Sequence, residues 1–170
     1  MVYWITGLIH SGKSTTLLKH FNESIESGTH SGGFVSEKFA DTTNRFSYTL
    51  KNLSSSDKFP LAIDQSDFKG EFEKIYAFDR FYFNQDAFDY GNALLIALSK
   101  NPHIQNIFID EIGVVELEGN GFSKGFQAAL SSQKNVYVCV RNKWLPRVVA
   151  HFQISERDIG SEILSPDTWV

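Results

Sequence analysis

Apolar residues follow two different periods along the chain, and the change from one to the other predicts strands and helices in turn. Residues 2–5 form a short run of apolar, β-prone residues, which favours a strand. Apolar residues then recur at helical spacing over residues 15–25 and again over residues 86–100. The apolar runs 104–110 and 136–140 have the length and composition of buried strands. This alternation predicts an α/β fold of three layers, with helices on both faces of a mainly parallel sheet.

The section between the first two helices has a different pattern. Residues 34–39 and 46–53 are strand-like, and the polar stretch 41–44 between them suits a hairpin turn. Residues 60–63 and 75–78 are two further short strand candidates. Because consecutive strands joined by short turns pair antiparallel, this section is predicted to be a small antiparallel insert beside the ligand-binding edge of the sheet.

The other elements are shorter. Asn84 is placed to cap the helix at residues 86–100 with its side chain. A loop over residues 119–125 leads into a further helix, and residues 144–152 favour a short one. Residues 153–155 are expected to form the last strand.

The composition fits one globular domain spanning residues 1–170, with 42% hydrophobic and 21% charged residues. A net charge of −4 argues against a broad basic surface for nucleic acid and against binding to anionic membranes. No run of about 18 apolar residues and no signal peptide is found, so we expect a cytoplasmic protein. Cys139 is the single cysteine, which excludes an internal disulfide and, in an apolar run, predicts a buried thiol.

Residues 7–14 read Gly-Leu-Ile-His-Ser-Gly-Lys-Ser, which is the Gly-x-x-x-x-Gly-Lys-Ser/Thr pattern of a phosphate-binding loop. Gly7 and Gly12 permit a tight turn, and the N–H groups of the loop then form a concave anion site. Lys13 reaches the β- and γ-phosphates, and Ser14 offers its hydroxyl to Mg²⁺. The helix that begins here adds its positive dipole end.

The predicted nucleotide-binding residues are the two glycines, the inner loop positions and the first residues of the helix: Gly7, His10, Ser11, Gly12, Lys13, Ser14 and Thr15. We expect His10 to contact nucleotide or water without taking part in the chemistry. The five histidines show no metal-ligand spacing, so zinc is not predicted. The expected ligands are Mg²⁺ and ATP or another nucleoside triphosphate.

Two acids follow the apolar run that ends near residue 110. A buried strand that ends in Asp110 places this carboxylate at the carboxyl edge of the sheet, where open α/β sheets bind their ligands. Asp110 can orient the Mg²⁺ shell together with Ser14. Glu111 can face the γ-phosphate and polarise an attacking water. An acid pair alone would be an ordinary strand end, but the phosphate loop about a hundred residues earlier favours the functional interpretation.

These motifs resemble those of the cancer-related nucleoside-triphosphatase family. Residues 32–37 resemble the family's Gly-Phe-x-Thr-x-Glu stretch, and residues 84–88 resemble the start of its middle helix. The most distinctive match is Ile-Asp-Glu-Ile-Gly at residues 109–113, followed by Glu116 and Leu117. The resemblance implies a small P-loop protein with a RecA-like sheet that hydrolyses nucleoside triphosphates to diphosphates with Mg²⁺. It assigns the general base to Glu111 and the Mg²⁺ shell to Asp110.

The chain departs from the family pattern where positive charge is common. Val114 and Val115 stand where the family often has Lys and Met, Ala40 stands where it has Arg, and Val140 stands where it has His. Because an arginine at the γ-phosphate is worth about 10³ to 10⁵ in rate, catalysis is expected to be slow or altered in substrate.

Three arginines are candidates for that role: Arg141, Arg80 and Arg147. Arg141 follows an apolar strand, so it should emerge at the ligand edge, and we place it among the catalytic residues with Lys13 and Glu111. A solvated surface position is an equally good interpretation of any single arginine. Phe81, Tyr82 and Trp144 are possible base-stacking residues, for which core packing is the favoured interpretation.

Three functions remain open from the sequence. The favoured one is Mg²⁺-dependent hydrolysis of a nucleoside triphosphate by water. The second is a nucleoside or small-molecule kinase, which would need an acceptor pocket and usually an arginine-rich lid that the chain lacks. The third is a nucleotide-dependent switch with weak turnover. Base preference is not encoded in a phosphate loop, and no protein partner is indicated.

Overall fold

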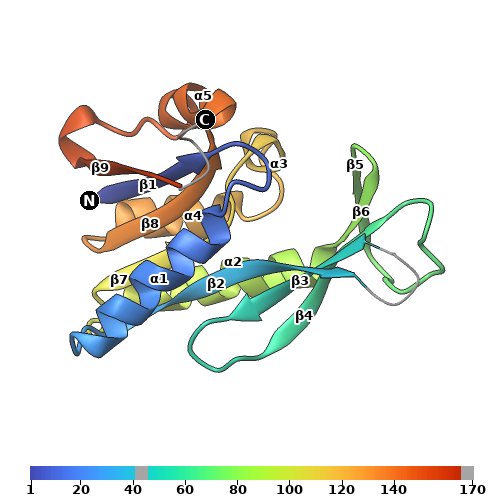
Figure 1. Ribbon diagram of the computed structural model, residues 1–170, viewed down its shortest axis with the longest axis horizontal. Helices are drawn as coiled ribbons and strands as arrows, with labels where there is room; N and C mark the ends of the chain where they lie inside the picture. The colour runs from blue at the N-terminus through green and yellow to red at the C-terminus, as the bar shows by residue number, and fades with distance from the viewer. Residues whose placement is uncertain (41–45, 166–170) are drawn as a thin grey trace.

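A computed structural model describes residues 1–40 and 46–165, which form a mixed sheet with helices packed on it (Figure 1). The strands are β1 (Val2–Gly7), β2 (Ser31–Ala40), β3 (Phe46–Asn52), β4 (Lys58–Asp64), β5 (Ile75–Phe78), β6 (Phe81–Asn84), β7 (Asn106–Ile109), β8 (Asn135–Arg141) and β9 (Ile159–Leu164). The α-helices are α1 (Lys13–Glu26), α2 (Gln85–Lys100), α3 (Val114–Leu117), α4 (Ser123–Ser131) and α5 (Leu145–His151). Short 3₁₀ turns lie at η1 (Asn142–Trp144) and η2 (Glu156–Asp158).

The sheet has two halves that share β2. Its strand order is β5-β6-β4-β3-β2-β7-β8-β1-β9. The half from β2 to β9 pairs in parallel, whereas the half from β2 to β5 pairs antiparallel. The predicted antiparallel strands are present, but the prediction of a mainly parallel sheet is wrong because the sheet is mixed. The antiparallel strands continue the same sheet and project from the body as an arm (Figure 1).

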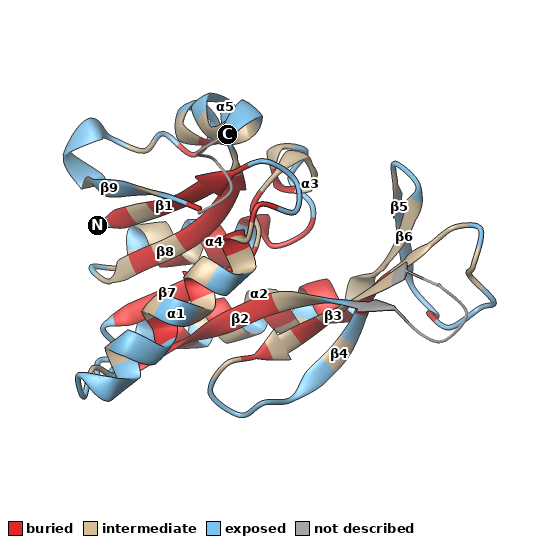
Figure 2. Cartoon of the chain, in the orientation of Figure 1, coloured by how far each residue is buried: buried red, intermediate tan, exposed pale blue. Residues whose placement is uncertain are grey.

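Helices cover both faces of the parallel half. On one face, Leu17 and Phe21 of α1 pack against Ile5 and Phe108, and the buried thiol of Cys139 lies in the same cluster, as predicted. On the other face, α2 and α4 cover a larger cluster (Figures 1 and 2). Because both faces of β7 and β8 are covered, these strands read as continuous apolar runs.

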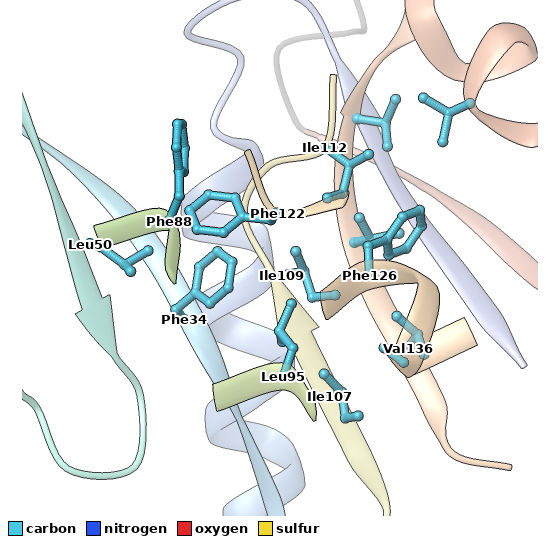
Figure 3. Close-up of a cluster of buried hydrophobic side chains, with 14 of the residues drawn as sticks. Phe34, Leu50, Phe88, Leu95, Ile107, Ile109, Ile112, Phe122, Phe126 and Val136 are labelled. Atoms are coloured by element: carbon cyan, nitrogen blue, oxygen red, sulfur yellow. The ribbon is translucent and has the colours of Figure 1, made fainter. Parts of the chain in front are cut away.

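Aromatic rings join the larger cluster to the arm. The ring of Phe34 in β2 lies 4.5 Å from that of Phe122, which is 5.1 Å from Phe88 of α2 (Figure 3). Burying side chains of this size contributes roughly 1.5–3 kcal/mol each relative to exposure. The helix that carries Phe88 begins as expected, since the side chain of Asn84 accepts a hydrogen bond from the backbone of Asp86 at 3.1 Å.

Three elements differ from the sequence-based expectation. Residues 153–155 do not form the last strand; β9 lies later and pairs in parallel with β1. The strand β6 and the helix α3 were not predicted, because four residues show no clear period. The turn expected at residues 41–44 lies outside the described residues.

Candidate active site

The loop between β1 and α1 turns as the glycine pattern requires. Gly12 has φ +78°, in the left-handed region that glycine adopts readily, and caps the start of α1. A Cβ atom at Gly7 would overlap with the hydroxyls of Ser11 and Ser165. His10 also has a positive φ of 61°. The loop therefore folds tightly back on itself before α1 begins at Lys13.

The side chain of Lys13 lies inside this loop. Lys13 is 6% exposed, and its ammonium donates a hydrogen bond to the carbonyl of Leu8 at 2.7 Å. Its charge is thus held against the backbone of the loop, next to the start of α1. Ser11 is almost fully buried, whereas Thr15 is exposed at the first turn of the helix.

The last described residue holds the loop from the other side. The hydroxyl of Ser165 donates to that of Ser11 at 2.7 Å, and its backbone N–H donates to the carbonyl of Thr6 at 3.0 Å. In the neighbouring strand, Glu162 accepts a hydrogen bond from the Thr6 hydroxyl at 2.7 Å. No sequence pattern predicted these contacts, since they depend on β9 lying beside β1.

The two distant motifs meet in the fold. The hydroxyl of Ser14 donates to Oδ2 of Asp110 at 2.6 Å, although 96 positions separate them in the chain. Ser36 of β2 holds the same acid, because its hydroxyl donates to the Asp110 carbonyl at 2.7 Å and its N–H to Oδ2 at 3.3 Å. Ser36 was not predicted as a site residue, yet it occupies the Thr position of the Gly-Phe-x-Thr-x-Glu stretch.

Burial governs the ionisation of Asp110, which is 3% exposed. Loss of hydration, and to a smaller extent the adjacent charge of Glu111, raise the pKa of Asp110 to about 6. Hydrogen bonds from Ser14, Ser36 and Cys139 lower this pKa and offset part of the cost. A cation bound beside Asp110 would favour the ionised form of this carboxyl group.

The second acid pairs with an arginine from the adjacent strand. Arg141 ends β8 opposite Gly7 of β1, and its Nε lies 3.0 Å from Oε1 of Glu111. Both side chains are about one third exposed, so solvent or a ligand reaches them. The structure thus brings together the loop, Asp110, Glu111 and Arg141 at one edge of the sheet.

Comparison with known proteins identifies the family of the chain. A protein-family model described as NTPase matches residues 2–161. The chain belongs to this NTPase family. It is therefore grouped with the enzymes that hydrolyse nucleoside triphosphates.

One curated protein and one solved structure resemble the chain over most of its length. The chain is 26% identical over 146 residues to the nucleoside-triphosphatase THEP1 of Methanocaldococcus jannaschii, which covers 85% of this chain and 81% of that protein. It also resembles the solution structure of a human cancer-related nucleoside triphosphatase, with a TM-score of 0.70 and 20% identity. That match covers 98% of this chain and 89% of the human protein, and at this identity it shows a shared fold.

The other two candidate arginines of this NTPase lie elsewhere. Arg80 is at the turn between β5 and β6, where it pairs with Asp64 at 3.3 Å and lies 5.0 Å from the centre of the Phe81 ring. Arg147 of α5 lies 5.2 Å from the ring of Trp144. Within residues 1–40 and 46–165, neither forms an ion pair with Glu111 or Asp110.

The possible base-stacking residues pack against other rings. The ring centre of Phe81 lies 5.6 Å from that of Tyr48, and the ring centre of Tyr82 lies 5.0 Å from that of Phe68, so both side chains belong to the arm. Trp144 packs against the larger hydrophobic cluster. Packing was the favoured interpretation of all three.

The donor set at the loop fits Mg²⁺ better than a metal held by protein alone. The described part of the chain has no group of three or more His, Cys, Asp or Glu residues arranged to hold a metal. Ser14 and Asp110 supply one hydroxyl and one carboxylate within hydrogen-bond distance. Mg²⁺ keeps several waters and is commonly held by one or two carboxylates together with substrate phosphates.

None of the described helices is long and apolar enough to cross a membrane.

Proposed function

We propose that this NTPase hydrolyses nucleoside triphosphates such as ATP or GTP to the diphosphate and phosphate with Mg²⁺. The observation that carries the proposal is the hydrogen bond between Ser14 and Asp110, which joins the phosphate loop to the acid pair. The loop N–H groups and Lys13 would bind the phosphates, with His10 and Thr15 at the surface of the loop and Ser11 buried beneath it. Ser14 and Asp110 would hold Mg²⁺, which, when bound, neutralises charge on the β- and γ-phosphates.

Glu111 is proposed as the general base. Its carboxylate accepts a proton from a water as the water oxygen bonds to the γ-phosphorus and the bond to the β–γ bridging oxygen breaks. The electron pair of the broken bond stays on the diphosphate. Arg141 now pairs with Glu111, so its guanidinium would turn to the γ-phosphate when substrate binds. That movement frees Glu111 for the water and adds positive charge where negative charge develops.

The finer fold assignment is part of the same proposal. A P-loop fold with a RecA-like sheet is supported by the position of β8, which lies between the strand before the loop and the strand before the acids. The continuous sheet supports one domain over residues 1–170. The low net charge supports a protein that acts on free nucleotides in the cytoplasm, without nucleic acid or membrane.

Phosphoryl transfer to a small-molecule hydroxyl is a second candidate, supported by one feature of the arm. Tyr48 of β3 is close enough to Glu111, Arg141 and Arg80 that all three charges act on its pKa, although burial is the main reason that this pKa is raised. An aromatic side chain near the proposed general base would suit an acceptor ring. Stimulation of ATP turnover by nucleosides, with a phosphorylated product, would favour the kinase.

The test of hydrolysis is Glu111→Gln. The amide cannot accept the proton, so we expect phosphate release to fall at least about 10²-fold while nucleotide binding is retained. Glu156→Gln, at an exposed glutamate of η2, is the control and should match the wild type. Undiminished release by the Glu111 variant would remove this residue from the base role.

A further inference from the structure

Glu116 is a buried acid that the proposed reaction does not use. It lies in α3, five residues after Glu111, and is 4% exposed. No Lys, Arg or His pairs with it in the part of the chain that the structure describes. Burial is the main reason that the pKa of Glu116 is raised to about 7, and the charge of Glu111 is a smaller contribution in the same direction. A carboxylate is costly in such a place unless both oxygens are hydrogen-bonded.

Both oxygens of Glu116 accept backbone N–H groups, and the two donors come from different segments. Oε2 accepts from Gly113 at 2.8 Å, just before α3, and Oε1 accepts from Phe122 at 3.0 Å, just before α4. The first contact is half of an ordinary capping box. The second reaches beyond the helix, so a local cap does not account for it.

One end of this link is fixed in the core. The ring of Phe122 is buried between Phe34 and Phe88 (Figure 3). The backbone of Gly121 passes so close to the carboxylate that a Cβ there would overlap with Oε1 of Glu116, and Gly121 has φ +55°. The carboxylate is therefore held in one place by the segment that precedes α4.

The other end lies two residues from the proposed base. Asp110 is anchored by Ser14 and Ser36, and the N–H of Ile112 donates to the carbonyl of Cys139 at 3.0 Å. Gly113, the next residue, is held by Glu116. The backbone of Glu111 thus lies between anchored positions on both sides, and Glu116 supplies the anchor furthest along the chain.

We propose that Glu116 is a positioning residue that fixes the backbone after Glu111 and so aims the Glu111 carboxylate at the γ-phosphate. The expected loss of turnover rests on the proposed role of Glu111 in hydrolysis. The hydrogen bonds of Glu116 to Gly113 and Phe122 do not depend on that role. A glutamine at this position has one oxygen and one NH₂ group, so one of the two N–H groups would face another donor. The loop would then shift, and a misplacement of about 1 Å can cost about 10²-fold in rate.

The kinetic test compares Glu116→Gln with Glu118→Gln. Glu118 follows α3 directly and is exposed, and it accepts from the hydroxyl of Tyr76 rather than from the loop. We expect kcat of the Glu116 variant to fall about 10- to 100-fold while the dissociation constant for Mg²⁺–nucleotide stays within about threefold. The Glu118 variant should match the wild type in both. Turnover within twofold of the wild type, or equal losses in turnover and binding, would overturn the proposal.

A second measurement uses the wild-type chain and needs no catalysis. In ¹⁵N NMR spectra recorded between about pH 5 and 9, the amides of Gly113 and Phe122 should shift together along one titration curve as Glu116 ionises. Glu111 is the charged neighbour that acts on Glu116, so the titration is repeated in Glu111→Gln, where the joint shift should persist. Independent movement of the two amides would disprove the link. Absence of phosphate release by the wild type, with the joint shift present, would instead disprove hydrolysis alone.

Discussion

The two halves of the sheet differ in how they are covered and in what they carry. In the parallel half, β7 is buried along its whole length, and the carboxyl ends of its strands bear the phosphate loop, Asp110 and Arg141. In the antiparallel arm, β5 alternates between exposed and half-buried positions and β6 is half-buried throughout. The covered strands hold the proposed reacting groups in fixed positions, whereas the strands of the arm are partly exposed to solvent. The expected effects of substitution therefore differ between the halves.

The largest difference is expected in stability. Phe126→Ala empties a fully buried position in α4 and should lower the free energy of unfolding by about 3–5 kcal/mol. Phe68→Ala, in the arm, removes a half-buried ring that contacts Phe72 and Tyr82, and should cost less than about 2 kcal/mol. Urea denaturation of the two variants measures both. Equal losses would show that the arm is as tightly packed as the body.

Substitution of an arginine should lower activity more in the parallel half than in the arm. Arg141→Ala removes the cation beside Glu111, and we expect kcat to fall about 10²- to 10³-fold. Arg80→Ala, in the arm, should leave hydrolysis within about threefold, because Arg80 pairs with Asp64. Steady-state phosphate release measures both variants. A larger loss for Arg80 would place the arm, rather than β8, at the γ-phosphate.

The free energy of unfolding should depend on pH through Glu116, the buried acid of α3. The pKa of Glu116 rises from 4.5 to about 7 on folding, so the folded chain binds more protons than the unfolded chain between these values. This group's contribution is therefore greatest below about pH 4.5 and falls as pH rises to about 7, by at most about 1.4 kcal/mol per pH unit. Glu116→Gln should lack this slope. Parallel curves for the two proteins, from unfolding at several pH values, would contradict the assignment.

The smallest effect is expected from an ion-pair cluster of the arm. Glu37 of β2 lies 2.7 Å from Lys58 and 3.3 Å from Lys51, and the hydrogen bond from Lys58 is the main reason that the pKa of Glu37 is lowered. Because these groups are partly exposed, Glu37→Gln should cost at most about 1 kcal/mol, and about 1 M salt should remove the difference. A loss above about 2 kcal/mol would show that this pair is shielded from solvent.

The same contrast explains what the sequence could predict. The central strands of the parallel half were predicted because strands buried on both faces are uninterrupted apolar runs. The loop was predicted from its glycines, and the meeting of Ser14 with Asp110 from the rule that ligands bind at the carboxyl edge. The roles of these residues in catalysis remain a proposal.

Elements at the edges of the sheet carried weaker signals. β9 reads Ile-Gly-Ser-Glu-Ile-Leu and is mostly exposed, so neither period stands out and the last strand was placed too early. The continuity of the arm with the sheet depends on β2 pairing with both β3 and β7, which no local pattern records. The contact of Ser165 with Ser11 joins segments 154 positions apart, and that of Glu116 with Phe122 reaches from α3 to the residue before α4, so neither follows from a local pattern.

The central claim is that the loop and the acid pair form one site for a metal–nucleotide complex. The most direct test is a crystal structure with a non-hydrolysable triphosphate and Mn²⁺, whose anomalous signal locates the metal. We predict the metal between the Ser14 hydroxyl and Asp110, the γ-phosphate against Lys13, and the Arg141 guanidinium turned from Glu111 toward that phosphate. A nucleotide bound elsewhere, or a metal remote from Asp110, would contradict the account.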